Sequence, residues 1–248
     1  MTRSVASLVL GTSLLCCVHV PAKTVVVTRG AARAEAITEP FTLVVWNVHK
    51  EPGALEDELP SLAEGASLVL VQEGMGPELD MHGVTSQVVA FRYVRGGGMT
   101  GVLTWSRDAP RTSTALRTRQ REPLVQTPKS ALVSEHALAD GTRLLVANLH
   151  GINFRPAGAL QRQLASLEAV LAPHDGPMIV GGDFNTWSKR RRAVVEAFVA
   201  RLGLARVFAG PIAPKLDAVF VRGLVVREAR MVDTEHSDHD ALVVTVER

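Results

Sequence analysis

The sequence predicts an α/β fold built as a four-layer sandwich, in which two mixed β-sheets pack face to face with helices outside. Short apolar runs typical of buried strands recur between residues 41 and 246. Some runs are joined by tight turns and others by segments with helical spacing, so strand–strand and strand–helix connections are mixed. The chain has 248 residues, which is enough to bury a sizeable core without disulfide bonds.

The N-terminus is predicted to be a signal segment. Arg3 provides a positive start, residues 5–20 are mostly apolar, and Val20-Pro21-Ala22 offers small residues for cleavage. The apolar stretch is shorter than the roughly 20 residues of a spanning helix. We therefore expect export to the periplasm or the medium, with an uncleaved membrane anchor and a buried first helix as alternatives. The predicted division of the chain is a signal segment at 1–22, a linker or edge segment at 23–40 and the folded domain at 41–248.

Two strands are predicted at the start of the folded domain, and both end at polar residues. Residues 41–46 are apolar and partly β-branched, and this run ends at Asn47. Residues 67–71 form a similar run, which gives way to a polar pair ending in Glu73. Between the two strands, residues 55–63 have the character of a short helix that a proline breaks or restarts.

The middle of the chain predicts a glycine-rich turn at 96–98, a strand over 101–105 and then a hairpin. The hairpin has apolar arms at 131–137 and 144–147. Asp140-Gly141 lies between these arms and is a strong signal for a tight turn.

Two helices and the closing strands are predicted in the last part of the chain. Four leucines at helical spacing predict a helix over 157–172, and residues 188–202 predict a second helix with a basic start. Between them, residues 178–180 form a buried strand that leads into Asp183. The four leucines are Leu160, Leu164, Leu167 and Leu171, and the closing strands are expected at 216–221, 225–232 and 241–246.

Composition and charge exclude several classes of site. The formal net charge of +2 is too small to indicate a nucleic-acid partner by itself. Both cysteines, Cys16 and Cys17, lie in the N-terminal apolar run. The folded domain therefore has no disulfide framework, no zinc–thiolate site and no cysteine nucleophile.

Carboxylates, amides and histidines collect at the ends of the predicted strands, where α/β folds place their sites. A single acid there is more often a cap or turn residue. Several buried acids together are costly unless a cation binds them, and oxygen ligands without thiolates suit Mg²⁺ or Mn²⁺. This combination predicts metal-assisted phosphoryl chemistry. The candidate residues are Asn47, Glu73, His150, Asp183, Asn185, Asp217, Asp238 and His239.

Six short motifs resemble, in the same order, those of the endonuclease/exonuclease/phosphatase superfamily, which has the deoxyribonuclease I-like fold. The resemblance covers about residues 41–246, and a closer similarity is to a poorly characterised bacterial branch. No single motif is specific, but their combination and order are. The motifs are Trp46-Asn47, Val71-Gln72-Glu73, Asn148-Leu149-His150, Gly182-Asp183-Phe184-Asn185, Leu216-Asp217-Ala218-Val219-Phe220 and Ser237-Asp238-His239.

The resemblance implies how a magnesium or manganese ion and the attacking water would be held. Asn47 and Glu73 would hold the metal, and Asp238 would contribute to the metal site or its surroundings. Asp183 would orient or deprotonate the water, and Asn185 would contact the phosphate.

The resemblance also implies roles for the histidines. His239 would pair with Asp217 and would stabilise the phosphate or act as the base, so the base is either His239 or Asp183. His150 could donate a hydrogen bond to a phosphate oxygen. Abasic-site endonucleases carry an acid at the position of His49 and a tyrosine at the position of His150. These two differences argue against a role in abasic-site repair.

The sequence therefore predicts a metal-dependent phosphodiesterase acting on nucleic acid, with lipid headgroups or small phosphorylated metabolites as the alternative. A non-catalytic binding module is disfavoured because every motif residue is present. We expect a monomer without a stable protein partner.

Two further features have competing interpretations. Lys189 to Arg192 could grip a phosphate or a DNA backbone, or form a solvated helix face, and at most two of the four can face the site. Trp187 could stack on a base or lie in the core. Trp46 and Trp105 are expected in the core.

Overall fold

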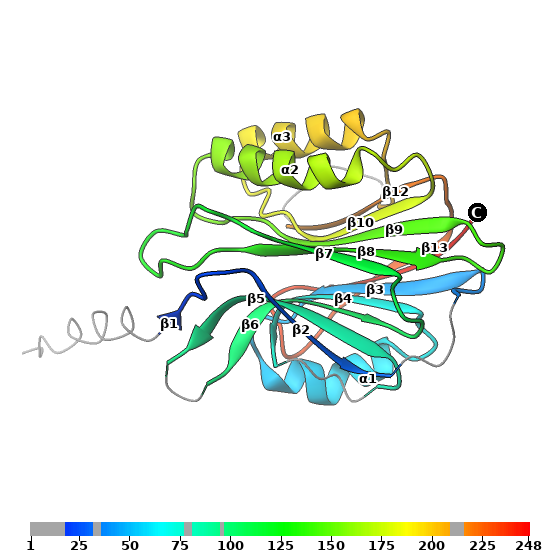
Figure 1. Cartoon of the computed structure of the whole chain (residues 1–248), viewed down its shortest axis with the longest axis horizontal. Helices are drawn as coiled ribbons and strands as arrows, with labels where there is room; N and C mark the ends of the chain where they lie inside the picture. The colour runs from blue at the N-terminus through cyan, green and yellow to red at the C-terminus, as the bar shows by residue number, and fades with distance from the viewer. Residues whose placement is uncertain (1–17, 32–35, 77–80, 95–96, 209–215) are drawn as a thin grey trace, which may run out of the picture.

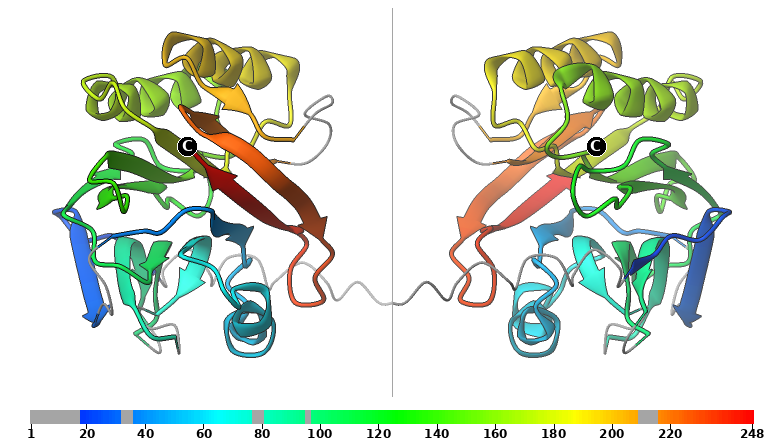
Figure 2. Two further views of the ribbon diagram at one scale, coloured as in Figure 1. Left: turned by 90° about the vertical axis from the view of Figure 1, so that its right-hand side faces the viewer. Right: turned by 90° about the vertical axis from the view of Figure 1, so that its left-hand side faces the viewer.

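The computed structural model describes residues 18–31, 36–76, 81–94, 97–208 and 216–248, and it confirms the predicted four-layer sandwich. Figures 1 and 2 show two sheets facing each other between an upper and a lower layer of helices. The predicted signal segment falls largely on residues 1–17, outside the described residues, as does Gly96 of the predicted turn.

The helices cover the outer faces of the two sheets. Among the described residues, no helix is long and apolar enough to span a membrane. The short helix predicted over 55–63 is observed as a five-residue π-helix that leads directly into a short α-helix, and Pro60 lies in the first turn of this α-helix. The helical elements are η1 (Ala54–Glu58), α1 (Leu59–Leu62), α2 (Ala157–Leu171) and α3 (Lys189–Arg201).

The first sheet has eight strands, and all pairs are antiparallel except β3 with β4. Its order is β1 (Val18–His19), β5 (Val84–Tyr93), β6 (Met99–Ser106), β4 (Leu68–Met75), β3 (Phe41–Asn47), β14 (Ala241–Glu247) and β13 (Val225–Val232), and β2 (Val25–Gly30) also pairs with β5.

The second sheet has six strands and contains the parallel pair β9 and β10, which α2 connects. In register, Asp183 lies opposite His150 on one side and Asp217 on the other. This register brings three predicted site residues to the same edge. The strand order is β11 (Ala205–Arg206), β12 (Asp217–Arg222), β10 (Met178–Asp183), β9 (Arg143–His150), β8 (Ser130–Ala137) and β7 (Thr112–Arg117).

The three largest of the four apolar clusters among the described residues hold the layers together. One lies between the sheets and includes Leu43, Leu70 and Ile179. The second packs α2 and α3 on the second sheet, and it contains all four leucines predicted to face the core. The third lies between the first sheet and α1, and it contains Trp46 and Trp105 as expected.

A polar link crosses the space between the sheets beneath the site edge. The Nε2 atom of Gln72 donates to the Oδ1 atom of Asn148 at 2.8 Å, and both side chains are fully buried. The amide nitrogen of Asn148 donates in turn to the carbonyl oxygen of Leu103 at 2.7 Å. Because buried polar groups are costly without partners, these bonds fix how the two sheets meet.

Four strands of the described residues were not predicted, namely β5, β7 and the two-residue strands β1 and β11, and β4 is longer than predicted. β5 carries buried Thr85, Ser86 and Gln87, which interrupt its apolar pattern, and β7 is an edge strand with an exposed polar start. β4 does not end at the pair Gln72-Glu73 but continues to Met75 through a bulge.

We expect Asn148→Ala to lower the free energy of unfolding by about 2–4 kcal/mol, because it leaves the Gln72 amide and the Leu103 carbonyl without their buried partner. Urea denaturation measures this difference. The matched control Thr114→Ala, at an exposed position of β7, should change stability by no more than about 0.5 kcal/mol. Equal effects of both substitutions would contradict the role of the link.

Candidate functional site

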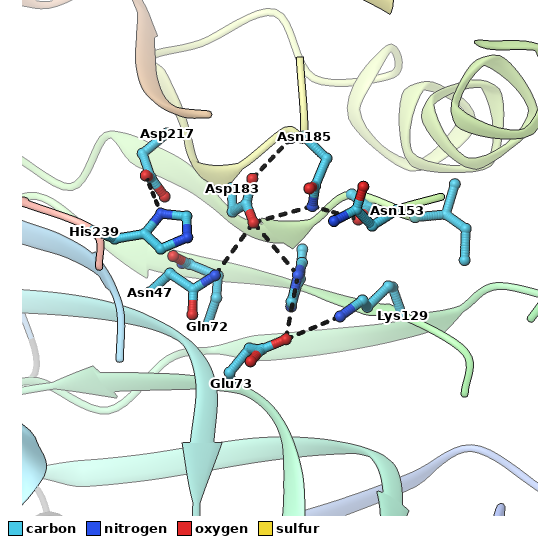
Figure 3. Close-up of polar contacts among 12 residues, drawn as sticks. Asn47, Gln72, Glu73, Lys129, Asn153, Asp183, Asn185, Asp217 and His239 are labelled. Carbon is cyan, nitrogen blue, oxygen red and sulfur yellow. Dashed lines mark hydrogen bonds and ion pairs between the residues drawn. The ribbon is translucent and has the colours of Figure 1, made fainter. Parts of the chain in front are cut away.

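The predicted site residues gather at one edge of the sandwich, where strand ends from both sheets meet (Figure 3). β3 of the first sheet ends at Asn47. β9 and β10 of the second sheet end at His150 and Asp183, and β12 begins at Asp217. The final loop before β14 adds His239, which bonds to Asp217.

A bulge in β4 directs Glu73 toward the second sheet. Successive residues of a regular strand point to opposite faces, yet Gln72 contacts Asn148 and Glu73 contacts His150, both on the second sheet. The register shifts between Gln72 and Gly74, and Glu73 has a φ of 58°. This left-handed conformation is unfavourable for a residue with a side chain, and such strain is concentrated at functional sites.

Two lysines, which the sequence analysis missed, neutralise Glu73. The Nζ atom of Lys129 lies 3.0 Å from Glu73 and 3.4 Å from Glu122, and Lys50 also pairs with Glu73. Burial would raise the pKa of the Glu73 carboxyl, but attraction by Lys129, His150 and Lys50 outweighs it and holds this pKa well below its usual range. Nothing in the local sequence distinguishes a buried lysine such as Lys129 from an exposed one.

Asp183 lies at the centre of the site and accepts several hydrogen bonds. Its carboxylate receives the side-chain amides of Asn47 at 3.2 Å and Asn185 at 3.0 Å, and the backbone N–H of Asn185 at 2.7 Å. The Nε2 atom of His150 is 3.4 Å away. Burial and repulsion by Asp217 nevertheless raise the pKa of Asp183 to about 7. Two buried carboxylates, Asp183 and Asp217, therefore lie close enough to repel each other.

His150 is a neutral imidazole at neutral pH. Its side chain is buried, and burial together with the charge of Lys129 lowers its pKa well below 6.5. Because it lies between Asp183 and Glu73, its ring can donate one hydrogen bond to a carboxylate or to a bound phosphate.

His239 and Asp217 form a close pair. The Nδ1 atom of His239 lies 2.5 Å from the carboxylate of Asp217. Burial would lower the pKa of His239, but the bond and charge of Asp217, with Asp183 and Asp238 nearby, raise it to about 9. His239 is therefore a cation at neutral pH, and Asp217 fixes the orientation of its ring.

Asp238 lies at the exposed rim of the site. Its side chain is 67% exposed, and its carboxylate lies 3.6 Å from His49 and 3.8 Å from His239. The structure therefore groups Asp238 with these histidines rather than with Glu73.

The donor set fits a hard divalent cation that keeps several of its own waters. Within the described parts of the chain, no group of three or more His, Cys, Asp or Glu side chains forms a ready-made metal cage. Magnesium, however, usually binds only one or two carboxylates and retains water. The buried Oδ1 atoms of Asn185 and Asp217 have no hydrogen-bond partner among the described residues, and Asp183 and Asp217 repel each other. Glu73 and Asn47 would hold the ion, next to Asp183.

The basic run from Lys189 to Arg192 contains a buried residue with a structural role and exposed residues. Arg191 is fully buried and donates to the carbonyl oxygens of Asn185, Arg155 and Ile152, whereas Lys189 and Arg190 are exposed. Trp187 is 53% exposed, so its interpretation as a core residue is wrong.

Comparisons with known proteins show the family of the chain. A family model described as the endonuclease/exonuclease/phosphatase family matches residues 44–239. A UPF0294 protein of Vibrio vulnificus (strain YJ016) is 37% identical over 220 residues, which span 83% of this chain and 76% of the relative.

Solved structures share the fold at low identity. An endonuclease/exonuclease/phosphatase family protein from Leptotrichia buccalis aligns with a TM-score of 0.59 and 15% identity, over 84% of this chain and 100% of that chain. The endonuclease domain of TRAS1, a telomere-specific non-LTR retrotransposon, aligns with a TM-score of 0.58 and 17% identity, over 84% and 98%.

We expect Asp217→Asn to lower the pKa of His239 from about 9 toward its ordinary value of 6.5, because the charge that holds the proton is removed. NMR titration of the imidazole protons measures this shift. His136, a buried histidine with a pKa of about 4, is the internal control and should not change. If His239 still titrates near 9 in the variant, Asp217 is not the group that raises its pKa.

The pair of His239 and Asp217 also predicts how the stability of the protein depends on pH. A histidine whose pKa is raised by folding stabilises the protein fully below its unfolded pKa, and this contribution is lost as the pH rises through the folded pKa. The wild type should therefore lose stability between about pH 6.5 and 9, and Asp217→Asn should lose less over this interval in thermal unfolding.

Proposed function

This chain belongs to the endonuclease/exonuclease/phosphatase family, and from that premise we propose that it is a divalent-metal-dependent phosphoesterase that hydrolyses phosphodiester bonds. The observation that carries the proposal is the setting of Asp183. This buried carboxylate receives amide hydrogen bonds from Asn47 and Asn185, with His150 and the Asp217–His239 pair beside it.

Each side chain has a place in the proposed reaction. Asp183 orients the attacking water and is placed to accept its proton. His239, held as a cation by Asp217, stabilises the negative charge that develops on the phosphate. His150 donates a hydrogen bond to a phosphate oxygen. A magnesium or manganese ion bound at Glu73 and Asn47 would neutralise charge on the phosphate.

Lys129 keeps this arrangement in place. Its buried ammonium bridges Glu73 and Glu122 and ties the start of β8 to β4. Because Glu73 has a strained backbone, this ion pair and the bond to Lys50 hold its carboxylate in position.

Nucleic acid is the proposed substrate, with phospholipid headgroups as the second candidate. The exposed Trp187 beside Asn185 supports nucleic acid, because an aromatic ring can stack on a base. The endonuclease domain of TRAS1 has the same fold. The exposed apolar residues Leu124 and Phe154 favour the second candidate. We further propose, from the apolar N-terminal segment, that the enzyme is exported and acts in the periplasm or outside the cell.

The substrate class is tested by incubating the protein with supercoiled plasmid, single-stranded DNA, RNA and bis-p-nitrophenyl phosphate, each with Mg²⁺ or EDTA. Metal-dependent degradation of nucleic acid would identify a nuclease. Cleavage of the small diester with intact nucleic acid would refute the nuclease and direct the search to lipid headgroups and metabolites.

We expect Asp183→Asn and His239→Gln each to lower turnover by about 10²–10⁴-fold, because each removes a group that acts on the reacting atoms. Turnover of bis-p-nitrophenyl phosphate measures the effect, and thermal unfolding verifies that the variants fold. The matched control Asp175→Asn changes an exposed carboxylate and should retain full turnover. Near-wild-type rates in either site variant would refute the site.

We expect EDTA to abolish activity and Mg²⁺ or Mn²⁺ to restore it. Binding is also measurable without turnover, since a ligand that binds only the folded state raises the melting temperature. Mg²⁺ should raise the melting temperature of the wild type but not of Glu73→Gln. Activity that is indifferent to EDTA would exclude the metal.

A further inference from the structure

Four large apolar side chains lie exposed on three loops beside the site, and we call them the apolar platform. Leu124 is 79% exposed, Phe154 69%, Trp187 53% and Val125 48%. Isolated exposed apolar residues are ordinary, but a contiguous group of them marks an interaction surface.

Hydrogen bonds join the three loops into one surface around Asn153. The backbone N–H of Asn153 donates to Glu122, and its side-chain oxygen accepts from the Nε1 atom of Trp187 at 3.0 Å. Arg155 donates to the carbonyl oxygen of Arg121 at 2.7 Å. Figure 3 shows Asn153 beside Asn185, so the platform borders the active centre.

The backbone holds two platform residues in a conformation that large side chains rarely adopt. Leu124 has a φ of 63° and Phe154 a φ of 50°. Each therefore combines an unfavourable backbone conformation with an unfavourable exposure of apolar surface. Such combinations persist where the surrounding structure enforces them, and they are concentrated at functional positions.

Arg191 makes the platform rigid. Its buried guanidinium binds the carbonyl oxygens of Asn185 and Arg155, and it lies 5.2 Å from the centre of the Trp187 ring. Because Asn185 also bonds to Asp183, the platform and the reacting centre are parts of one connected structure.

The charge around the platform is strongly positive. Besides the buried Arg191, segments 119–128, 151–158 and 186–192 contain six basic residues, and their one acidic residue, Glu122, is buried and pairs with Lys129. Exposed apolar side chains surrounded by lysine and arginine are typical of surfaces that bind anionic lipid. The six basic residues are Arg119, Arg121, Arg155, Lys189, Arg190 and Arg192.

We propose that the apolar platform docks the enzyme on an anionic phospholipid membrane, with the active centre close to the bilayer surface. Aromatic rings can stack on nucleic-acid bases, but the aliphatic side chains of Leu124 and Val125 cannot, whereas all four residues insert favourably between lipid headgroups. The proposal goes beyond the catalysed reaction, because it concerns where the enzyme binds and not which bond it cleaves.

Trp187 provides a direct measurement. The other two tryptophans, Trp46 and Trp105, are buried, so a change in tryptophan emission on binding reports Trp187. The full chain is titrated with vesicles containing equal parts of phosphatidylcholine and phosphatidylglycerol. The emission should shift to shorter wavelength and be quenched by lipids brominated in the acyl chain. The N-terminal apolar segment carries no tryptophan, so its binding alone does not produce this signal.

A platform variant and a matched control complete the test. Leu124→Ser/Val125→Ser/Phe154→Ser should weaken vesicle binding by roughly tenfold or more. Val225→Ser/Met231→Ser removes two half-exposed apolar side chains from β13, and this variant should bind as the wild type does. Thermal unfolding verifies that both variants fold.

Three outcomes would overturn the proposal. These are unchanged Trp187 emission with vesicles, equal weakening in both variants, and an emission change with single-stranded DNA but not with vesicles. The readouts are binding and fluorescence, so failure here is distinguishable from failure of the proposed hydrolysis.

Discussion

The hydrogen bond between Gln72 and Asn148 is the contact on which the rest of the site depends. It crosses the apolar space between two sheets whose contact there is mainly through apolar side chains, which have no directional preference. Hydrophobic packing tolerates small sliding movements, whereas a buried amide pair permits only one register. Glu73 follows Gln72, and His150 lies two residues beyond Asn148, so the same bond positions a carboxylate of one sheet against a histidine of the other.

The carboxylates near this link form two groups, which differ in how far cationic side chains neutralise them. Glu73 is compensated within the chain by Lys50 and Lys129. Asp183 and Asp217 are buried and repel each other, although the cationic His239 is paired with Asp217. A fold selected only for stability would avoid buried carboxylates that repel each other. Their presence is understandable if a positively charged ligand completes the site, which is the basis of the metal assignment.

The elements that could be predicted are those with a local signal in the sequence, and the features that could not be predicted depend on contacts between distant residues. The spacing of apolar residues in the strands and of the leucines in α2 is visible within a short stretch of sequence, so these strands and helices were predicted. β7 has no such pattern, because an edge strand is stabilised on one side only. The burial of Lys129 and the exposure of Trp187 depend on loops that approach from elsewhere in the chain. The ordered motifs identified the strand-end residues that the structure brings together.

The left-handed backbone at Glu73 has a consequence for engineering. Glycine is the residue that this conformation favours, so a search for stabilising substitutions would select glycine at the position where the carboxylate is needed. Glycine would also be selected at Asn185, which has the same left-handed conformation. At Phe154 a polar residue such as serine would be selected, because the ring is exposed. Sequences optimised for thermostability alone would therefore lose these residues first. A comparison of such designs with natural relatives would separate the positions kept for folding from those kept for activity.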